Sequence, residues 1–521
     1  MGLIPPFPLM PRSMKAAKAA NALGRAAAGK HFRDLRPDRE DAPVDLTLTL
    51  RLRELLADYK DLRQAPPGGQ QRRGQKFNAL LAELLQAWGL TARHSVRGVD
   101  GLDETDVFFT AEQTNYILEA KWEAEPINAE PLIKLADRLN NRPPGTRGIV
   151  LSVSGYTQPA LEWVKRRQDI LLLDITHIEA LLCGMLGPVD LLDLLYAETA
   201  AAGNRLVPLA DILVPSHEDP GPAPQLRPVG EVQLPWPVVE STANGVTAVE
   251  AFTGVWSPPQ TPSAFTASRG NRLLITTAAG VIDFHTTTGR STWALALPGT
   301  EDRAVRGEDG LLTVLCRGAL VRWHPKTRTI ELLAGGFGGY ATLEAGRDGT
   351  LWVFNQVGAL HGGSIILTRI GERPGDEQRH DVPFPGAERA VWLAPGRFFL
   401  TANGHSIPLD LTKDPAATKD DWVDSTLPNP KAAVAPDEHT VLYAGTCGSL
   451  NGSLHCRDLR QDAVPAELLT VAANRITDLA LTNTGSAGTS GWMLADVSGN
   501  TQNPTPVLVR WDISAAPSTS G

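Results

Sequence analysis

Several features that define common protein classes are scarce or missing in this 521-residue chain. Its four cysteines, Cys183, Cys316, Cys447 and Cys456, are too few and too scattered for a disulfide scaffold or a zinc cluster. No apolar run approaches the roughly 20 residues that span a bilayer. The N-terminal stretch has its apolar residues before its basic ones, which is the wrong order for a secretory signal. We therefore expect a cytoplasmic protein with no membrane partner.

Further absences limit the chemistry. The phosphate-binding pattern G-x-x-x-x-G-K-[ST] does not occur, so the chain has no recognisable ATP-driven motor. The 11 histidines are scattered, and none stands at metal-binding spacing from a partner. Acidic side chains (58) outnumber basic ones (49), giving a net charge of -9. This balance argues against a nucleic-acid-binding surface over the whole protein, although it is compatible with a local basic cleft.

The residues that are present divide the chain into regions of different texture. With 42% hydrophobic and 21% charged residues, the composition is that of a globular protein, and the length calls for more than one domain. We expect a multidomain protein in which an α/β domain is followed by an all-β propeller. The predicted regions are a basic N-terminal arm and helix (1–65), the α/β domain (66–205), a proline-rich linker (206–244), the propeller (245–513) and a disordered tail (514–521).

The N-terminal arm is rich in positive charge. Residues 12–39 hold eight lysines and arginines against two aspartates, Asp34 and Asp38. Contact with a phosphate backbone and a simple solvated tail are both compatible with this pattern. The following stretch, 44–63, predicts a short strand or turn and then a helix.

The α/β region alternates helical and strand periodicity. Its first helix places Phe77, Leu81, Leu84 and Trp88 on one face. The predicted helices are 75–88, 129–141, 157–167, 177–186 and 188–200, and the predicted strands are 91–96, 105–110, 115–122, 148–154 and 170–175. The last two strands are continuously apolar, which indicates a sheet that is covered on both faces.

After residue 245 a pattern of turn, apolar strand, turn and strand recurs. Successive turns lie near Gly270, Gly310, Gly349, Gly396, Glu438 and Gly491. The spacings of 40, 39, 47, 42 and 53 residues, obtained by subtraction, are typical of propeller blades with four strands each. We expect six blades. Strand 246–256 would complete the last blade or begin a seventh.

One short stretch carries an unusual charge pattern. In NYILEAKW (115–122), Glu119 and Lys121 stand two positions apart and so share one face of the predicted strand. The preceding strand holds Asp106, which adjacent pairing would bring beside Glu119. Two carboxylates and the Ala120 carbonyl would suit a hard divalent cation, and Lys121 could orient water and stabilise charge on a phosphate. A surface ion pair would also explain Glu119 and Lys121 if they stood alone.

The surrounding motifs favour the catalytic interpretation. Four motifs follow one another along the chain, in the order RRGQKFNALLAELLQAWGL, DETDVFF, YILEAKW and GIVLSVSGYTQPALEW. Over residues 70–182 the chain resembles the catalytic domain of Mrr-type restriction endonucleases in the PD-(D/E)xK nuclease superfamily. The resemblance implies a mixed sheet flanked by helices and Mg²⁺-dependent (or Mn²⁺-dependent) cleavage of DNA. It also implies that Asp106 and Glu119 hold the metal and that Lys121 is the catalytic lysine.

The chain departs from this family pattern at one position. Many relatives have an acidic residue directly after the phenylalanine of the first helix, and here that residue is Asn78. Glu83 and Glu104 are two candidate accessory carboxylates that could compensate, and a solvent-facing role is the alternative for Glu104.

We therefore expect a metal-dependent DNA endonuclease whose propeller binds a protein or ligand and controls the nuclease, with defence against phage or plasmids as a plausible setting. Homo-oligomerisation stays open. One alternative is a catalytically inactive nuclease fold that serves as a binding scaffold. Another is a propeller-based hydrolase, which would need Asp348, Asn355 and Asn403 to converge near the propeller axis.

Overall fold

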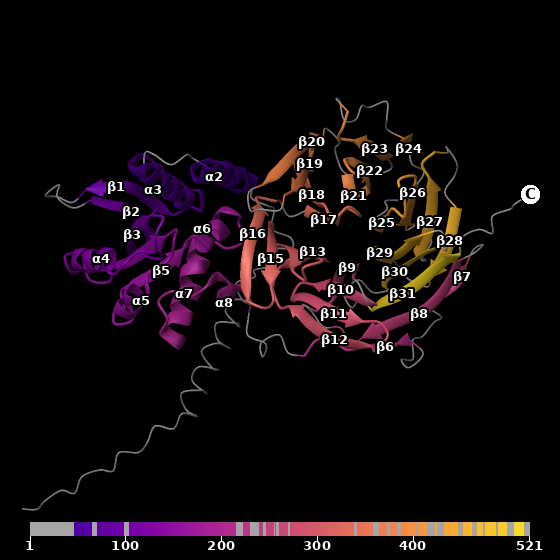
Figure 1. Ribbon diagram of the computed structural model, residues 1–521, viewed down its shortest axis with the longest axis horizontal. Coiled ribbons are helices and arrows are strands. Elements are labelled where there is room, and N and C mark those ends of the chain that lie inside the picture. The colour runs from indigo at the N-terminus through magenta and orange to yellow at the C-terminus, as the bar shows by residue number, and fades with distance from the viewer. Residues whose placement is uncertain are drawn as a thin grey trace, which may run out of the picture. The chain divides into compact units, whose positions relative to one another are not determined.

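The computed structural model describes most of the chain after the N-terminal arm. The described residues are 46–64, 70–97, 104–214, 222–229, 239–242, 246–254, 256, 260–268, 271–337, 341–357, 364–371, 376–382, 387–402, 405–413, 423–424, 432–445, 452–460, 466–471, 475–485, 488–496 and 505–514. The basic segment 12–39 and residues 515–521 lie outside them. The chain forms two compact units, Met1–Leu181 with Leu186–Asp219 and Leu182–Met185 with Pro220–Gly521 (Figure 1).

The first unit is an α/β domain built on a five-stranded mixed sheet in the order β1-β2-β3-β4-β5. The pairs β1–β2 and β2–β3 are antiparallel, whereas the pairs β3–β4 and β4–β5 are parallel. The strands are β1 (Thr91–Arg97), β2 (Glu104–Ala111), β3 (Thr114–Lys121), β4 (Arg147–Ser152) and β5 (Ile170–Asp174). The helices are α2 (Leu46–Gln64), α3 (Gln70–Ala87), α4 (Glu130–Asn140), α5 (Gln158–Val164), α6 (Ile175–Leu182), α7 (Pro188–Ala202) and α8 (Leu209–Leu213).

Helices cover both faces of this sheet, which confirms the expected α/β class. α3 packs on β1, β2 and β3, while α4 packs on β4 and α5. One core cluster joins Leu135 of α4, Ile117 of β3, Val150 of β4 and Val164 of α5. β4 and β5 are almost wholly buried because both of their faces meet helices.

A glycine in β4 lets α4 approach the sheet closely. A Cβ atom at Gly148 would lie 2.9 Å from side-chain atoms of both Leu135 and Leu139 of α4. Both atoms are the ends of flexible leucine side chains, so a larger residue would require these side chains to move. Gly148 pairs with Ile117 in the neighbouring strand β3. The last turn of α4 is thereby held near the end of β3.

Two stretches differ from the sequence expectation. Residues 46–64 form a single helix, α2, so the short strand or turn expected over 44–63 is not seen within its described part. Segment 206–244 was expected as a linker, but it contains α8, the three-residue β6 and the short β7. Tertiary contacts explain this difference, because β6 and β7 are stabilised as strands only by pairing with β8 and β28.

The second unit is a six-bladed β-propeller, as expected. Its first four sheets have four strands each. They comprise β9 (Pro262–Ser268), β10 (Arg272–Thr277), β11 (Gly280–His285) and β12 (Arg290–Leu295); β13 (Thr300–Arg306), β14 (Leu312–Cys316), β15 (Ala319–His324) and β16 (Thr329–Gly335); β17 (Ala341–Ala345), β18 (Leu351–Val357), β19 (Ser364–Ile370) and β20 (Glu377–Val382); and β21 (Ala387–Ala394), β22 (Arg397–Ala402), β23 (His405–Asp410) and β24 (Val423–Asp424).

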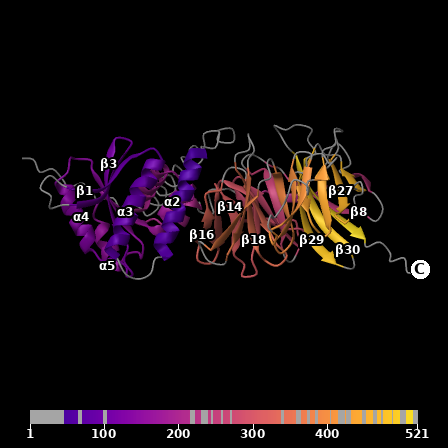
Figure 2. The ribbon, with the colours of Figure 1, turned by 90° about the horizontal axis from the view of Figure 1, so that it is seen from above.

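The last two blades are completed by strands from earlier in the chain. The fifth sheet contains β25 (Ala432–Val434), β26 (Thr440–Gly445), β27 (Gly452–Asp458), β28 (Ala466–Val471) and β7 (Val239–Thr242). The sixth contains β29 (Arg475–Gly485), β30 (Gly488–Asp496), β31 (Pro506–Ser514), β8 (Val246–Gly254) and β6 (Leu226–Pro228). Strand 246–256 therefore completes the last blade and does not begin a seventh. Figure 2 shows the blades from a second direction.

The innermost strands close the ring. β9, β13, β17, β21, β25 and β29 contact one another in turn, and β29 returns to β9. Buried ion pairs join four of these strands. Arg303 of β13 pairs with Asp478 of β29 and lies 3.1 Å from Glu344 of β17. Arg389 of β21 lies 3.4 Å from the same Asp478. Burial opposes ionisation of Asp478, but the two guanidinium groups hold its pKa below the usual value.

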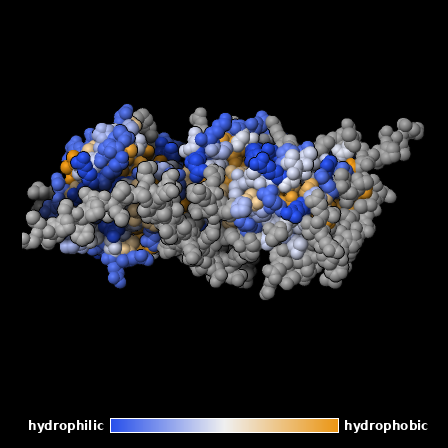
Figure 3. Space-filling view, turned by 90° about the horizontal axis from the view of Figure 1, so that it is seen from below, coloured by the Kyte–Doolittle hydropathy of each residue, from blue (hydrophilic) through white to orange (hydrophobic). Residues whose placement is uncertain are grey.

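Apolar side chains are rare on the described surface. Leu50 and Ile133 are the large hydrophobic residues exposed among the described residues. In the view of Figure 3, the coloured surface of the first unit is mostly hydrophilic with scattered hydrophobic spots. None of the described helices is long and apolar enough to cross a membrane.

Candidate active site

The acidic pair lies where two strands of the nuclease-like sheet separate. The paired register of β2 and β3 runs from Ala111↔Thr114 to Val107↔Leu118 and ends there. Continuing the same register by one position would set Asp106 opposite Glu119. The pairing of β2 with β3 stops at that position, although β2 still pairs with β1 and β3 with β4, which leaves both carboxylates where β2 and β3 separate. The structure thus brings Asp106, Glu119 and Lys121 together.

Hydrogen bonds hold the Asp106 carboxylate on both oxygens. The side-chain amide of Asn78 on α3 donates to Oδ1 at 2.9 Å. The backbone N–H of Ala120 donates to Oδ2 at 3.0 Å. Because these donors come from different elements, the orientation of Asp106 depends on the packing of α3 against the sheet. Its side chain keeps 22% of its surface exposed, so it can still be reached from solvent.

Glu119 is the buried member of the pair. It retains only 6% exposure, and its Oε1 accepts a hydrogen bond from Nη1 of Arg138 on α4. Burial, together with the nearby charge of Asp106, raises the pKa of Glu119 from 4.5 to about 7, although Arg138 and Lys121 act in the opposite direction. A carboxylate in this state is only partly ionised near neutral pH, and an added cation would favour its ionised form.

Lys121 sits between the two carboxylates. Its Nζ lies 3.6 Å from Oε2 of Glu119 and 3.8 Å from Oδ2 of Asp106. These separations are longer than a good hydrogen bond, so the ammonium group is near both acids without being tied to either. Its side chain is 28% exposed. The Lys121 ammonium group can therefore contact a ligand that binds beside Asp106 and Glu119.

The donor set suits a hard divalent cation. Asp106 and Glu119 offer oxygen ligands from neighbouring strands, and the Ala120 carbonyl stands between Glu119 and Lys121 in the chain. Within the described parts of the chain, no cluster of three or more His, Cys, Asp or Glu side chains could hold a metal. Mg²⁺ typically uses only one or two carboxylates and keeps several waters. The residues present therefore fit Mg²⁺ or Mn²⁺ better than a soft metal that needs nitrogen or sulfur ligands.

The sequence did not reveal two of the neighbours. Asn78 stood out only as a missing acid, whereas the structure shows it as the hydrogen-bond donor that orients Asp106. Arg138 was not singled out, because a basic residue on an amphipathic helix normally faces solvent. Nothing local distinguishes Arg138 from Lys134 one turn earlier, which is 66% exposed and pairs with Glu130.

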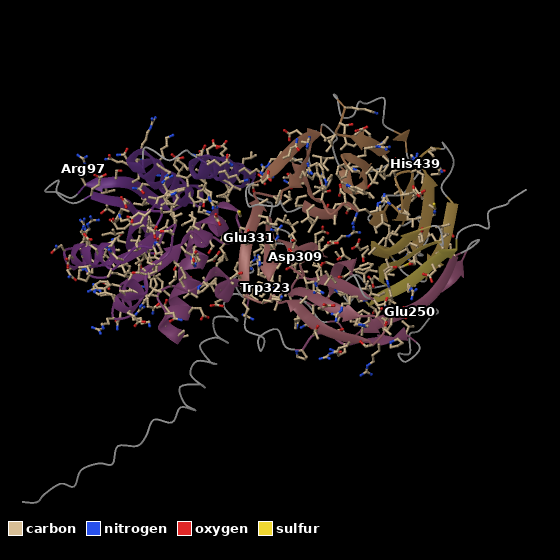
Figure 4. All side chains as sticks on the ribbon, in the orientation of Figure 1. Arg97, Glu250, Asp309, Trp323, Glu331 and His439 are labelled. Atoms are coloured by element: carbon tan, nitrogen blue, oxygen red, sulfur yellow. The ribbon has the colours of Figure 1, made fainter. Side chains whose placement is uncertain are left out.

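The two accessory candidates have other partners. Glu83 forms a 2.6 Å ion pair with Arg51 of α2. Glu104 shares a strand face with Asp106, but its carboxylate lies 3.7 Å from Arg97 at the end of β1. Arg97 is labelled in Figure 4. No contact described for either residue involves Asp106, Glu119 or Lys121.

Residues near the site also support its shape. Trp122 packs edge-on against Phe77 at 4.7 Å between ring centroids, and the Arg73 guanidinium lies 5.4 Å from the Trp122 ring. Ser152 and Ser154 donate to the carbonyls of Gly155 and Glu125. These aromatic and hydroxyl contacts fix the strand ends and the turn beside the site.

The two described propeller residues proposed for a hydrolase, Asp348 and Asn355, do not lie on the innermost strands. Asp348 lies in the turn before β18 and accepts hydrogen bonds from Thr350. Asn355 is buried on β18, the second strand of its blade. Asn403 lies outside the described residues. Among the described acids of the innermost strands, Glu344 and Asp478 are paired with arginine, whereas Asp302 accepts a hydrogen bond from the backbone N–H of Leu343.

Comparison with known proteins gives one match that bears on function. Residues 70–182 match the family model Mrr_cat, described as a restriction endonuclease. No curated protein matches the chain. The match includes Asn78, Asp106, Glu119 and Lys121, and it ends at the C-terminus of α6.

Solved structures are similar only at a low level. A luciferin-regenerating enzyme is 10% identical with a TM-score of 0.38, covering 55% of this chain and 95% of its own. A gluconolactonase from Xanthomonas campestris is 12% identical with a TM-score of 0.35, covering 54% of this chain and 99% of its own. A protein of unknown function, AF1548, is 17% identical with a TM-score of 0.19, covering 21% and 64%. Similarities of this size support no inference about activity.

Proposed function

We propose that this chain, whose residues 70–182 form a restriction endonuclease domain of the Mrr type, hydrolyses DNA phosphodiester bonds with Mg²⁺ or Mn²⁺. The main support is the meeting of Asp106, Glu119 and Lys121 at the point where β2 and β3 separate. A structural ion pair would not require two carboxylates on adjacent strands with one ammonium group between them. That geometry is the one that a phosphate-cleaving site needs.

The carboxylates would hold the metal. Asp106, Glu119 and the Ala120 carbonyl would supply its protein ligands. When bound, such a cation lowers the pKa of its water and polarises the phosphoryl group. Asn78 and the Ala120 N–H keep Asp106 oriented, since each donates to one of its oxygens. The burial of Glu119 keeps bulk water away from one side of the site.

Lys121 would act on the substrate. Its ammonium group, less than 4 Å from both acids, can orient the attacking water and stabilise the negative charge that grows on the phosphate. The low exposure of Glu119 strengthens this electrostatic effect, because charges interact more strongly where water is excluded.

The alternative of an inactive scaffold rests on Asn78. The amide of Asn78 is not an acid, so this position supplies no carboxylate ligand for a second metal ion. Asn78 nevertheless contacts Asp106 directly and keeps it oriented, which an inactive site would not need. We therefore favour an active enzyme with a single principal metal site.

The propeller would bind a partner or ligand and control the nuclease. A nuclease has to be restrained in its own cell, which makes defence against foreign DNA a plausible setting. Glu344 and Asp478 on its innermost strands are paired with arginines, and Asp302 accepts a backbone hydrogen bond, which disfavours a hydrolase centred on the propeller axis. If the propeller restrains the nuclease, proteolytic cleavage between the two units should increase the rate of DNA cleavage, compared with the intact chain.

The direct test is incubation of the purified full chain with supercoiled plasmid and Mg²⁺. Nicked or linear DNA should appear, EDTA should prevent it, and Asp106→Asn should remove it. Glu83→Gln is a matched control, because Glu83 pairs with Arg51 and should not affect cleavage. Cleavage that persists in Asp106→Asn, in a preparation free of contaminating nuclease, would contradict the proposed site.

A further inference from the structure

The buried carboxylate of the site, Glu119, already has a guanidinium group as its partner. Arg138 lies in the last turn of α4 and donates to Oε1 of Glu119. Lys121 lies 3.6 Å from Oε2 of the same carboxylate. Both oxygens of Glu119 thus face a cation. The close approach of α4 to the sheet over Gly148 makes the contact with Arg138 available.

The charges of the site balance without a metal. When both acids are ionised, Asp106 and Glu119 contribute two negative charges, and Lys121 and Arg138 contribute two positive ones. A divalent cation on Glu119 would therefore compete with Arg138 for the same oxygens and would repel it. A DNA phosphate has the opposite charge and accepts paired hydrogen bonds from guanidinium, so it offers Arg138 an alternative partner.

We infer that Arg138 is a positioning residue that exchanges partners. It holds Glu119 while the site is without metal and turns to a DNA phosphate beside the scissile bond when Glu119 serves as a metal ligand. The binding of metal and of DNA then favour each other, because the metal releases Arg138 to bind the phosphate and the phosphate draws Arg138 away from Glu119. This inference rests on the proposed function. The side chain of Arg138 is 25% exposed, so it has a route toward a ligand in solvent.

A purely structural ion pair makes the opposite forecast. If Arg138 only orients Glu119 for metal binding, its removal should weaken metal binding. If Arg138 competes with the metal, its removal should strengthen metal binding in the absence of DNA. The sign of the change in affinity therefore separates the two roles without reference to catalytic activity.

The experiment measures Mn²⁺ affinity of the full chain by isothermal titration calorimetry. Without DNA, Arg138→Gln should bind Mn²⁺ at least fivefold more tightly than the wild type. Lys134→Gln on the same helix is the matched control and should bind Mn²⁺ like the wild type, since Lys134 pairs with exposed Glu130. If Arg138→Gln lowers the melting temperature by more than a few degrees, Arg138→Met, which keeps the aliphatic stem, takes its place with the same expectation.

The coupling to DNA is measured in a background of Lys121→Ala, which slows turnover by roughly 10²–10³. A short duplex should tighten Mn²⁺ binding at least fivefold when Arg138 is present and less than twofold in Arg138→Gln, within the range of coupling usual for linked sites. Unchanged or weaker Mn²⁺ binding by Arg138→Gln without DNA would overturn the inference, as would an equal gain in Lys134→Gln. If the wild type neither binds Mn²⁺ nor cleaves plasmid, the proposed function itself fails.

Discussion

Replacing Glu119 with glutamine should stabilise the metal-free protein at alkaline pH while it abolishes DNA cleavage. Glu119 is 6% exposed, and burial, with the charge of Asp106, raises its pKa to about 7. Above that pH the folded chain must hold an ionised carboxylate in a poorly solvated place. Glutamine has the same size and can still accept a hydrogen bond from Arg138, but it carries no charge.

The magnitude follows from the difference between the folded and unfolded pKa values. A rise from 4.5 to about 7, at 1.36 kcal/mol per pH unit, corresponds to at most ~3 kcal/mol. The raised pKa means that the folded state binds the proton more tightly than the unfolded chain. This stabilisation is complete below pH 4.5 and is lost as the pH rises through about 7. Glu119→Gln should therefore gain up to ~3 kcal/mol at pH 8.5 and about 1 kcal/mol at pH 5.5.

The assay is pulse proteolysis of the full chain in urea and EDTA, with mass spectrometry of peptides from β2 and β3. These peptides report unfolding of the first unit separately from the propeller. Glu83→Gln is the control, because Glu83 is 46% exposed and should show no pH-dependent gain. A glutamine variant that is no more stable than the wild type at pH 8.5, or one whose gain is the same at both pH values, would refute the reasoning.

Three further outcomes are expected. Lys121→Ala should reduce the rate of plasmid cleavage by roughly 10²–10³, because it removes charge stabilisation at the phosphate. It removes no metal ligand, so Mn²⁺ affinity should stay within about threefold of the wild type. Loss of metal binding would argue against this role. Asp478→Ala should destabilise the propeller by about 3–5 kcal/mol in urea unfolding, since it leaves Arg303 and Arg389 buried without their shared partner, and a change below about 1 kcal/mol would contradict this. Limited proteolysis should cut near the boundary between the two units, Asp219 and Pro220, and release two stable fragments, whereas a chain that resists cutting there would speak against two separable units.

The order of elements in the first unit could be predicted closely from the sequence. The five strands and the helices between them lie within a few residues of their predicted positions, apart from the first helix, α3, which begins five residues before the predicted start. Their patterns are strong because each buried face repeats at the period of its own backbone. The number of blades was also predictable, since the turn residues recur at a regular interval.

Local patterns failed where a segment depends on a distant partner. β6 and β7 lack a strand pattern of their own and exist because β8 and β28 pair with them. The role of Asn78 was hidden for the same reason. Its amide meets Asp106 only when α3 lies across the end of β2. The prolines and short polar residues of 206–244 suggested a linker. Local composition could not show that the edges of distant strands are available to pair with this segment.

By itself the sequence determined which chemistry is present: the alternation of side chains in a strand places Glu119 and Lys121 on one face, and the order of motifs places Asp106 one strand away. Only the tertiary structure decided how that chemistry is poised. The burial of Glu119, the pairing of Arg138 with its carboxylate and the two donors to Asp106 each join residues from different elements. Helix periodicity shows which face of α4 is polar, but only the packing of α4 on β4 shows that Arg138 of this helix reaches the acid.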